Sequence, residues 1–369
     1  MPVPLMDIRG QYEHLLDDVK RAVCEVIDSG RFILGPNVRA LEEEVAAAVC
    51  ARHAVAVGNG TDALILALEA LGVGPGDEVV CPSYTFYATA EAVARVGARP
   101  VFADIDLATF NLDPAAADAA VTDCTRAIIA VHLFGQPADL AALREVADRH
   151  GVALIEDAAQ AFGSTRDGRS AGSFGDAATL SFFPTKNLPA MGDGGMVLAR
   201  DGDVAERVRM LRFHGSKDKR VFEHVGVNSR LDEMQAAILR TLLPHVEGWN
   251  SARRTVAARY AHLGLGDLVA LPAEAAATRH VYHLYVVRSP ERDALAGRLR
   301  EAGVGSAFYY ATPLHLQPVF ASLGYRPGDL PQTERAAREG LALPMFPTLP
   351  ESAQREVVAA VRAASPAAA

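Results

Sequence analysis

The chain has 369 residues, of which half are hydrophobic and 22% are charged, and its formal net charge is −9. This composition is typical of a globular protein with a large core, and the length favours two domains of roughly 150 residues each. The negative charge argues against nucleic acid or an anionic membrane as the main partner.

Through the first two thirds of the chain, short apolar runs alternate with helical runs. We predict helices at 61–71, 86–96, 138–150 and 204–213, and strands at 54–57, 78–81, 126–131, 153–156, 178–182 and 196–198. Gly72, Gly97 and Gly151 follow three of the helices, as glycines that end helices commonly do. Such alternation indicates an α/β domain with a mostly parallel sheet.

The pattern changes after a helix predicted at 231–243, which Pro244 ends. A long polar helix is predicted at 246–262, followed by a strand at 281–287, a helix at 291–302 and a strand near 306–309. We therefore expect a large domain over residues 1–245, with an N-terminal helical segment, and a smaller α+β domain over residues 246–369. Because no flexible linker separates them, the two domains should share a cleft.

The chain contains no sign of export, of a membrane span or of a metal centre. It does not begin with a basic segment and an apolar core, and no apolar run approaches the length of a membrane span. Four cysteines lie far apart without a Cys-x-x-Cys pair, so neither a zinc site nor an iron–sulfur cluster is predicted. We expect a cytoplasmic protein with no metal.

A turn with two glycines, Gly58-Asn-Gly-Thr-Asp62, separates the first predicted strand from the first predicted helix. Free N–H groups at a helix start favour a phosphate, and glycines let the backbone approach it closely. The turn matches neither the Walker motif nor the dinucleotide fingerprint. The alternative is that Thr61 or Asp62 caps the helix with no ligand present, and the residues of the turn leave both interpretations open.

Asp157 and Lys186 are the residues with the strongest chemical implication. Asp157 stands at the carboxyl end of a predicted strand, which is the edge where open α/β sheets bind ligands. Lys186 follows an apolar run and precedes Gly192-Asp-Gly-Gly195, and burial there would lower the pKa of its amine. An amine that bonds to an aldehyde, with a carboxylate that keeps a pyridine nitrogen protonated, indicates pyridoxal phosphate. The alternatives are a solvated loop lysine and, for Glu156 and Asp157, a helix cap.

Six ordered sequence blocks resemble the DegT/DnrJ/EryC1/StrS family of sugar aminotransferases, which are fold-type I pyridoxal-phosphate enzymes. The blocks cover nearly the whole chain and are Gly58-Asn-Gly-Thr-Asp-Ala-Leu64, Pro82-Ser-Tyr-Thr-Phe86, Glu156-Asp-Ala-Ala-Gln160, Ser181-Phe-Phe-Pro-Thr-Lys186, Gly192-Asp-Gly-Gly195 and Val227-Asn-Ser-Arg-Leu-Asp-Glu233. The resemblance implies a large domain with a mostly parallel seven-stranded sheet between helices, and a smaller C-terminal α+β domain. It also implies pyridoxal 5′-phosphate as the cofactor.

The resemblance implies a role for each residue of the cofactor site. Lys186 would hold the cofactor covalently and move a proton, while Asp157 would pair with the pyridine nitrogen. Gln160 would bond the ring hydroxyl, and Phe86 would stack on the ring. The phosphate would be held by Gly60, Thr61, Asp62, Ser181 and, across a homodimer with shared active sites, Asn228 of the partner subunit. Asn228 as a helix cap and Ser181 as an ordinary strand serine remain alternatives.

Lysine at position 186 favours transamination, because related sugar dehydratases of this fold carry histidine there. The resemblance implies amino transfer from an amino acid, L-glutamate, to a keto group of a dTDP-linked or UDP-linked sugar. The segment 30–36 and Gln160 resemble members that act at C-3 more than members that act at C-4. Candidate substrate contacts are His214, Arg230, Tyr309, Tyr310 and His315.

Two features leave the substrate open. Relatives often have His-Tyr-Pro-Ile-Pro where this chain has Tyr309-Tyr-Ala-Thr-Pro313, and aromatic residues beside a small-domain strand often serve packing alone. Alternative functions are amination of a keto-cyclitol, as in aminoglycoside pathways, a lyase acting on an amino acid, and a regulatory or binding protein without turnover. The intact Lys186 and Asp157 argue against the last of these.

Overall fold

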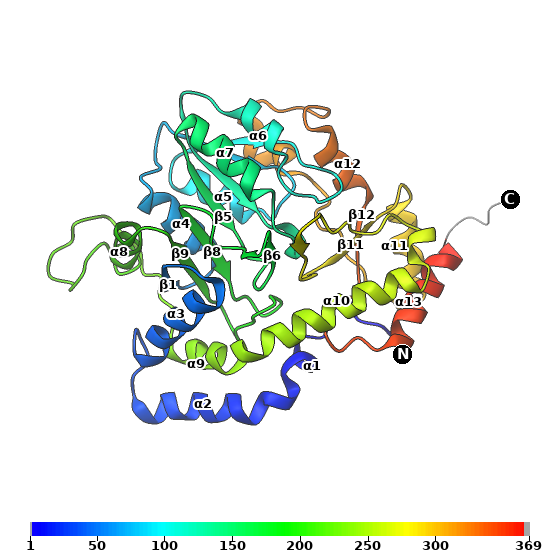
Figure 1. The fold of residues 1–369 in the computed structure, drawn as a ribbon, viewed down its shortest axis with the longest axis horizontal. Coiled ribbons are helices and arrows are strands. Elements are labelled where there is room, and N and C mark those ends of the chain that lie inside the picture. Colours follow the sequence, from blue (N-terminus) through cyan, green and yellow to red (C-terminus); the bar gives the residue numbers. More distant parts are fainter. Residues whose placement is uncertain (1, 365–369) are drawn as a thin grey trace.

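A seven-stranded sheet forms the centre of the computed structural model, which describes residues 2–364 (Figure 1). Its strands lie in the order β1 (His53–Val57), β9 (Gly195–Ala199), β8 (Ala177–Ser181), β5 (Ala153–Asp157), β4 (Thr125–Val131), β2 (Glu78–Pro82) and β3 (Arg99–Ala103). Strand β9 runs antiparallel to both of its neighbours, and all other adjacent pairs are parallel. The mostly parallel sheet expected from the sequence is confirmed.

Helices cover both faces of the sheet, because successive residues of a strand point to opposite faces. Val79, Ile129 and Ile155 pack on one face, against α4 (Gly60–Ala70) and α5 (Ala88–Arg95), and α8 (Gly202–Leu211) joins this layer at the β1 end. The other face is covered by α6 (Pro114–Ala120), α7 (Leu140–His150), α2 (Leu16–Ser29), α3 (Pro36–Val49) and α9 (Glu233–Leu242). The short helix α1 (Ile8–Tyr12) precedes α2.

The C-terminal part is built on α10 (Val246–His262), which matches the predicted span and crosses the lower half of Figure 1 diagonally. One face of α10 is buried, and it includes the polar residues Asn250 and Arg253. Strand β11 (Tyr285–Arg288) pairs with β12 (Gly340–Leu343), and the remaining elements are α11 (Arg292–Glu301), α12 (Pro331–Glu339) and α13 (Glu351–Ala364).

The division into domains at residues 245 and 246 stays a prediction, and its ends at residues 1 and 365–369 lie outside the described residues. Strand pairing and a shared apolar cluster connect the two parts. Strand β10 (Thr278–Arg279) pairs with β6 (Thr165–Arg166), which itself pairs with β7 (Arg169–Ser170). Leu284 and Val286 also belong to the same apolar cluster as Val79.

Three details of the predicted elements were wrong. Strand β3 was missed because Pro100 interrupts its apolar pattern, yet a proline is tolerated there because β3 is an edge strand. The strand predicted at 281–287 begins only at Tyr285, because the N–H groups of Val281 and Leu284 bond the carbonyls of Gly135 and Phe134 instead of a neighbouring strand. The strand predicted near 306–309 is reduced to a single bridge between Ala307 and Ala342.

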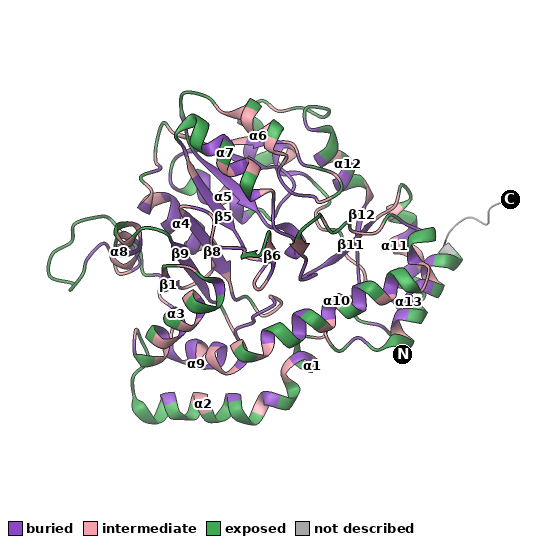
Figure 2. Ribbon diagram, viewed as in Figure 1, coloured by how far each residue is buried: buried purple, intermediate pink, exposed green. Residues whose placement is uncertain are grey.

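The segment between α8 and α9, residues 212–232, includes a loop that stands away from the body of the protein (Figure 1), and this loop is coloured as exposed in Figure 2. Its tip carries large apolar side chains, of which Val225 is 96% exposed. Within residues 2–364, the helices are too short or too polar to cross a membrane.

Candidate active site

A cavity of about 670 Å³ opens where three neighbouring strands end. Val131, Asp157 and Ser181, the last residues of β4, β5 and β8, all line it. This is the sheet edge at which open α/β folds bind ligands. The cavity brings together nine of the predicted site residues, namely Gly60, Thr61, Phe86, Asp157, Gln160, Ser181, Lys186, Tyr309 and Tyr310.

The start of α4 forms one end of the cavity. Helix α4 begins at Gly60, and its cap is Asn59, whose side-chain oxygen accepts a hydrogen bond from the Asp62 N–H at 2.8 Å. The alternative cap at Thr61 or Asp62 is therefore wrong. The N–H groups of Gly60 and Thr61 belong to the first helical turn, where a helix offers no acceptor of its own. These two N–H groups are better candidates for binding an anion than the Asp62 N–H, because the Asp62 N–H already bonds Asn59.

Glycine at position 60 is required by the close approach of α4 to the end of β8. A Cβ atom on Gly60 would lie 2.7 Å from the Cβ of Ser181. Because no side chain intervenes, the Ser181 hydroxyl can lie beside the first N–H groups of α4. A Cβ on Gly195 would likewise lie 2.3 Å from the carbonyl of Asn59. Both glycines allow the backbone to form a tight cradle for a phosphate.

The carboxylate of Asp157 is buried and fixed by two hydrogen bonds. Thr89 Oγ1 donates to Oδ2 at 3.0 Å, and the Ala159 N–H donates to Oδ1 at 3.2 Å. No helix begins within residues 158–164, so Asp157 is not a helix cap. The sequence analysis did not identify Thr89. In the structure its hydroxyl also lies 3.2 Å from that of Thr85, four residues earlier.

Lys186 lies in the same cavity, and its surroundings alter its ionisation. Burial lowers the pKa of Lys186 to about 8, and the Asp157 carboxylate partly opposes this effect. A lysine with such a pKa is partly neutral near neutral pH, as a nucleophilic amine must be. The chain beside it is anchored, because Lys186 N–H donates to the Phe183 carbonyl at 2.8 Å and Asn187 Nδ2 donates to Asn250 Oδ1 at 2.7 Å.

Gln160 has a defined orientation. Its Oε1 accepts from the Phe134 N–H at 2.8 Å, and its Nε2 donates to the Tyr310 hydroxyl at 3.1 Å. The second hydrogen of Nε2 is left to donate to an oxygen in the cavity. Phe86 is 56% exposed and its ring centre lies 6.2 Å from that of Tyr310, so the two rings border the same space.

Glu156, adjacent to Asp157, is fully buried in a different network. It accepts hydrogen bonds of 2.7 Å from the N–H groups of Gly172, Phe174 and Gly175, and it pairs with His132 Nε2 at 2.9 Å. Burial would raise the pKa of Glu156, but the bonds from His132 and the backbone lower it overall. Glu156 therefore stays ionised and joins β5 to His132 and to the loop at residues 172–175.

Five predicted site residues do not line the cavity. Asp62 accepts from the Ser229 hydroxyl at 2.6 Å, and His315 is buried, with Nδ1 2.7 Å from Ser83 Oγ. The others flank the exposed loop between α8 and α9, where Asn228 is exposed and bridges to Phe213: they are Asn228, His214 and Arg230. Their roles stay predictions.

Several lining residues were not predicted. His283 and Leu284 come from the C-terminal part, and Phe183, Asp193 and Phe308 are among the others. His283 has no neighbouring motif that marks it, because it lies in an apolar run typical of a strand. Its position follows only from the packing of the two parts of the chain.

The donors in the cavity fit pyridoxal 5′-phosphate. The N–H groups of Gly60 and Thr61 suit its phosphate, the fixed Asp157 carboxylate suits a protonated pyridine nitrogen, and the Lys186 amine suits its aldehyde. The apolar and aromatic lining suits a flat ring.

Comparisons with known proteins agree with this fit. Similar proteins include the "Pleiotropic regulatory protein" of Geobacillus stearothermophilus, 53% identical over 97% of both chains. The "dTDP-3-amino-3,4,6-trideoxy-alpha-D-glucose transaminase" of Streptomyces venezuelae is 46% identical over 98% of this chain and 95% of that protein. The crystal structure of S. venezuelae DesV in complex with a ketimine intermediate matches with a TM-score of 0.95 and 45% identity, over 98% of both chains.

The match to a family model covers almost the whole chain. The model describes the DegT/DnrJ/EryC1/StrS aminotransferase family and matches residues 14–362. This span includes every site residue described above and both parts of the fold. The chain belongs to the DegT/DnrJ/EryC1/StrS aminotransferase family.

Proposed function

We propose that this chain, with pyridoxal 5′-phosphate, transfers an amino group from an amino acid to the C-3 keto group of a dTDP-linked or UDP-linked sugar. The observation that carries the proposal is the meeting of Lys186, Asp157 and the start of α4 in one cavity. The similarity to a dTDP-3-amino-sugar transaminase over nearly the full length supports the choice of substrate. We propose L-glutamate as the amino donor.

The cofactor supplies an electron sink that stabilises negative charge on the carbon bearing the transferred nitrogen. Lys186 has the position and the partly neutral amine to remove the proton from that carbon and to return it. Asp157, held by Thr89 and Ala159, would keep the ring nitrogen protonated. Its fixed carboxylate needs no rearrangement to do so.

The remaining residues would orient the cofactor. The N–H groups of Gly60 and Thr61 and the hydroxyl of Ser181 would bind the phosphate at the positive end of α4. Gln160 would donate its remaining Nε2 hydrogen to the ring oxygen, because Phe134 already holds its carbonyl oxygen.

One assay tests the reaction and its donor. Purified protein with pyridoxal phosphate is given L-glutamate and each member of a panel of 3-keto and 4-keto sugars on dTDP and UDP. We expect 2-oxoglutarate to form with a 3-keto sugar and much less with its 4-keto isomer. A keto-cyclitol without a nucleotide is the matched comparison, and turnover with it alone would favour the cyclitol alternative. No 2-oxoglutarate with any acceptor would reject the proposal.

We further propose a homodimer in which each active site draws on both copies. The loop between α8 and α9 exposes Val221, Phe222 and Val225, and large exposed apolar side chains mark interaction surfaces. Asn228 lies at the base of this loop, outside the cavity of its own chain. A second copy seated on the loop would cover the apolar tip and receive Asn228 in its own cavity.

Mixed dimers test the sharing directly. Lys186→Met and Asn228→Asp proteins are expected to be weak or inactive alone. Refolding or exchanging them together should restore activity, because one site of each mixed dimer then has both native residues. For the interface, Val225→Asp should yield monomers by light scattering, while Val319→Asp, at a 61% exposed position elsewhere, should not. Full activity of monomeric Val225→Asp would contradict a shared site.

A regulatory protein without turnover is the second candidate, because a relative at 53% identity is named a pleiotropic regulatory protein. The two candidates differ in a simple measurement. An aminotransferase changes the absorption spectrum of its bound cofactor when an amino donor is added, and a keto acid reverses the change. If no amino acid changes the spectrum of the bound cofactor, the regulatory candidate is favoured.

A further inference from the structure

The turn at residues 133–136, which follows β4, connects the cavity to the C-terminal part of the chain. On its cavity side, the Phe134 N–H donates to Gln160 Oε1 at 2.8 Å. On its other side, the Gly135 carbonyl accepts from the Val281 N–H at 3.0 Å. The turn that holds one end of the Gln160 amide is therefore bonded directly to the C-terminal part.

This contact is close and constrains the shape of the turn. Phe134 has a φ of 58°, a left-handed conformation that is unfavourable for a residue other than glycine. Its carbonyl accepts from the Leu284 N–H at 3.4 Å. A Cβ atom on Gly135 would lie 2.9 Å from Val281 Cγ2 and 3.0 Å from the backbone nitrogen of His283. Such a conformation persists because contacts on both sides of the turn hold it.

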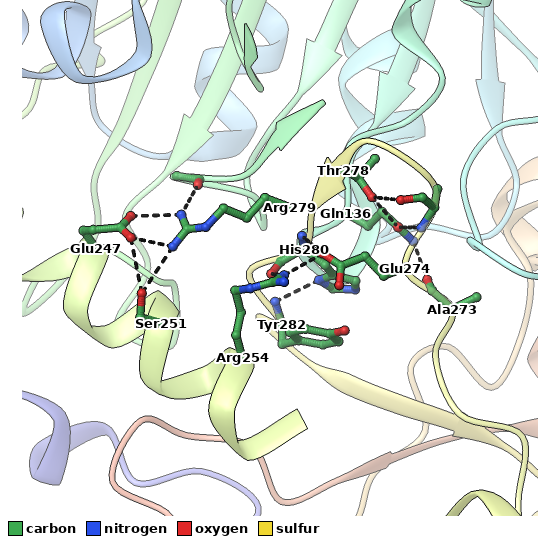
Figure 3. Close-up of polar contacts among 12 residues, drawn as sticks. Gln136, Glu247, Ser251, Arg254, Ala273, Glu274, Thr278, Arg279, His280 and Tyr282 are labelled. Carbon is green, nitrogen blue, oxygen red and sulfur yellow. Dashed lines mark hydrogen bonds and ion pairs between the residues drawn. The ribbon is translucent and has the colours of Figure 1, made fainter. Parts of the chain in front are cut away.

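Gln136, the last residue of the turn, binds the segment that leads to Val281 (Figure 3). Its Nε2 donates to the Ala273 carbonyl at 2.9 Å, and its Oε1 accepts from the Ala275 N–H at 2.7 Å. The same Oε1 lies 3.3 Å from Thr278 Oγ1. One side chain of the large domain thus makes three polar contacts that hold this segment of the C-terminal part against the turn.

Tyr310 approaches Gln160 from a second segment of the C-terminal part. Its hydroxyl oxygen accepts from Gln160 Nε2 at 3.1 Å. Burial raises the pKa of Tyr310, and the bond from Gln160 opposes this effect only in part, so the hydroxyl stays neutral. The segment is also fastened to the large domain, because the Tyr84 hydroxyl donates to the Tyr309 carbonyl.

These two contacts leave the Gln160 amide one orientation. A backbone N–H can only donate, so the amide atom that faces Phe134 is the oxygen and the atom that faces Tyr310 is the nitrogen. One hydrogen of Nε2 goes to Tyr310, and the other has no acceptor among residues 2–364. Because the C-terminal part supplies one partner and holds the other, the direction of the second hydrogen depends on how that part is seated.

We propose that Tyr310 is a positioning residue for the cofactor: together with the turn at residues 133–136, it fixes the Gln160 amide so that the free Nε2 hydrogen meets the ring oxygen of pyridoxal 5′-phosphate. This role deepens the proposed function and rests on Lys186 and Asp157 holding that cofactor in the cavity. Tyr310 acts through Gln160 and need not touch the ring oxygen itself. Removing its hydroxyl should therefore weaken the recognition of one cofactor atom and leave the rest of cofactor binding intact.

A cofactor analogue tests this at the single atom. 3-Deoxypyridoxal 5′-phosphate keeps the aldehyde, the ring nitrogen and the phosphate but lacks the ring oxygen. The dissociation constants of both compounds are measured by absorption titration, and the ratio of the analogue's constant to the cofactor's reports how well the ring oxygen is recognised. In Tyr310→Phe we expect this ratio to fall about fivefold, the order of one hydrogen bond, while the affinity for the analogue stays within about twofold of native.

Tyr325→Phe is the matched control for Tyr310→Phe. The Tyr325 hydroxyl likewise bonds to the protein, because it accepts from the Phe102 N–H at 2.8 Å and donates to the Phe102 carbonyl at 3.2 Å. Tyr325 does not line the cavity. Its replacement also removes hydrogen bonds, yet the ratio should stay native.

Gln136→Met tests the part played by the turn. Methionine has a similar length but cannot make the three polar contacts of Gln136, so the ratio should fall in the same direction as in Tyr310→Phe. Gln354→Met is the matched control, because Gln354 is a buried glutamine that donates to the Val256 carbonyl at 2.8 Å away from the cavity. A native ratio in Gln136→Met would overturn the role given to the turn.

A double substitution shows whether Tyr310 acts through Gln160. Gln160→Ala alone should lower the ratio at least as far as Tyr310→Phe does. Adding Tyr310→Phe to Gln160→Ala should then change the ratio no further, because the amide through which Tyr310 acts is already gone. A further fall in the double variant would mean that Tyr310 affects the ring oxygen by another route, and would contradict the proposal.

The outcomes separate the possibilities. If Tyr310→Phe is folded by circular dichroism and its ratio stays within about twofold of native, Tyr310 only fills space and the proposal fails. If Tyr310→Phe does not fold, Tyr310→Met decides by the same criterion. Borohydride reduction of cofactor-loaded native protein, followed by peptide mapping, shows separately whether Lys186 holds the cofactor. An unlabelled Lys186 would overturn the proposed function, whereas a labelled Lys186 with an unchanged ratio in Tyr310→Phe would overturn the role of Tyr310 alone.

Discussion

Replacing Lys186 with methionine should stabilise the cofactor-free protein at neutral pH. Methionine has a similar length and is apolar, so it removes the ammonium without leaving a large void. The amine has its ordinary pKa of 10.5 when unfolded and about 8 when folded. At 1.36 kcal/mol per pH unit, this drop means that charged Lys186 lowers the free energy of unfolding by about 3 kcal/mol.

The sign of the effect depends on pH. Below pH 8 the lysine is protonated in both states, so the folded protein carries the full penalty. Between pH 8 and 10.5 the folded state loses the proton while the unfolded chain keeps it, so the native protein becomes more stable as pH rises through this window. Lys186→Met has no such dependence. Its advantage should therefore be largest at pH 7 and should disappear near pH 10.5.

Differential scanning calorimetry of the cofactor-free proteins measures this. For a chain of this length, about 3 kcal/mol corresponds to roughly 4 °C in Tm at pH 7. Lys20→Met is the control, because Lys20 is exposed on α2 and its replacement should give a Tm difference that does not change over the same pH window. The reasoning would be refuted if Lys186→Met were less stable than the native protein at pH 7, or if its advantage grew toward pH 10.

Two further substitutions test the cradle and the buried carboxylate. Gly60→Ala places a Cβ 2.7 Å from that of Ser181, so α4 must shift, and affinity for pyridoxal phosphate should fall about tenfold by fluorescence titration. Gly297→Ala, where nothing lies within 4 Å, should keep the native affinity and gain about 0.5 kcal/mol of stability. Glu156→Gln turns an acceptor of three N–H groups and of His132 into a partial donor, and should cost about 3–5 kcal/mol in calorimetry. A Glu156→Gln protein with native Tm would contradict the account of that network.

The sheet and two main residues of the site were predictable because their signals are local. Buried parallel strands are short apolar runs, and Asp157 and Lys186 stand at or just after the ends of such runs, so the predicted strand ends also placed these two side chains at the edge where the cavity opens. The position of Gly60 was predictable for the same reason. What the sequence could not give was the cap at Asn59, because several residues of that turn are equally able to cap a helix.

The parts that were missed depend on contacts between distant segments. Thr89 reaches Asp157 across 68 positions, and His283 enters the cavity from the other part of the chain. Neither residue differs in type from the residues that fill ordinary helices and strands. Strand β3 was hidden by Pro100, which is acceptable only because the strand proves to be at the edge of the sheet. Such features follow from tertiary packing and are absent from any local pattern.

The neighbours Glu156 and Asp157 show how one sequence block can serve two separate purposes. Because adjacent residues of β5 point to opposite faces, Asp157 meets Thr89 of α5 in the cavity while Glu156 enters the loops on the other side. Their substitutions should therefore have different consequences. Asp157→Asn should weaken cofactor chemistry with little change in Tm, since the Ala159 N–H can still bond the amide oxygen and the Thr89 hydroxyl can turn to accept from the amide nitrogen, whereas Glu156→Gln should lower Tm first. Equal losses of stability would mean that the two carboxylates form one structural unit.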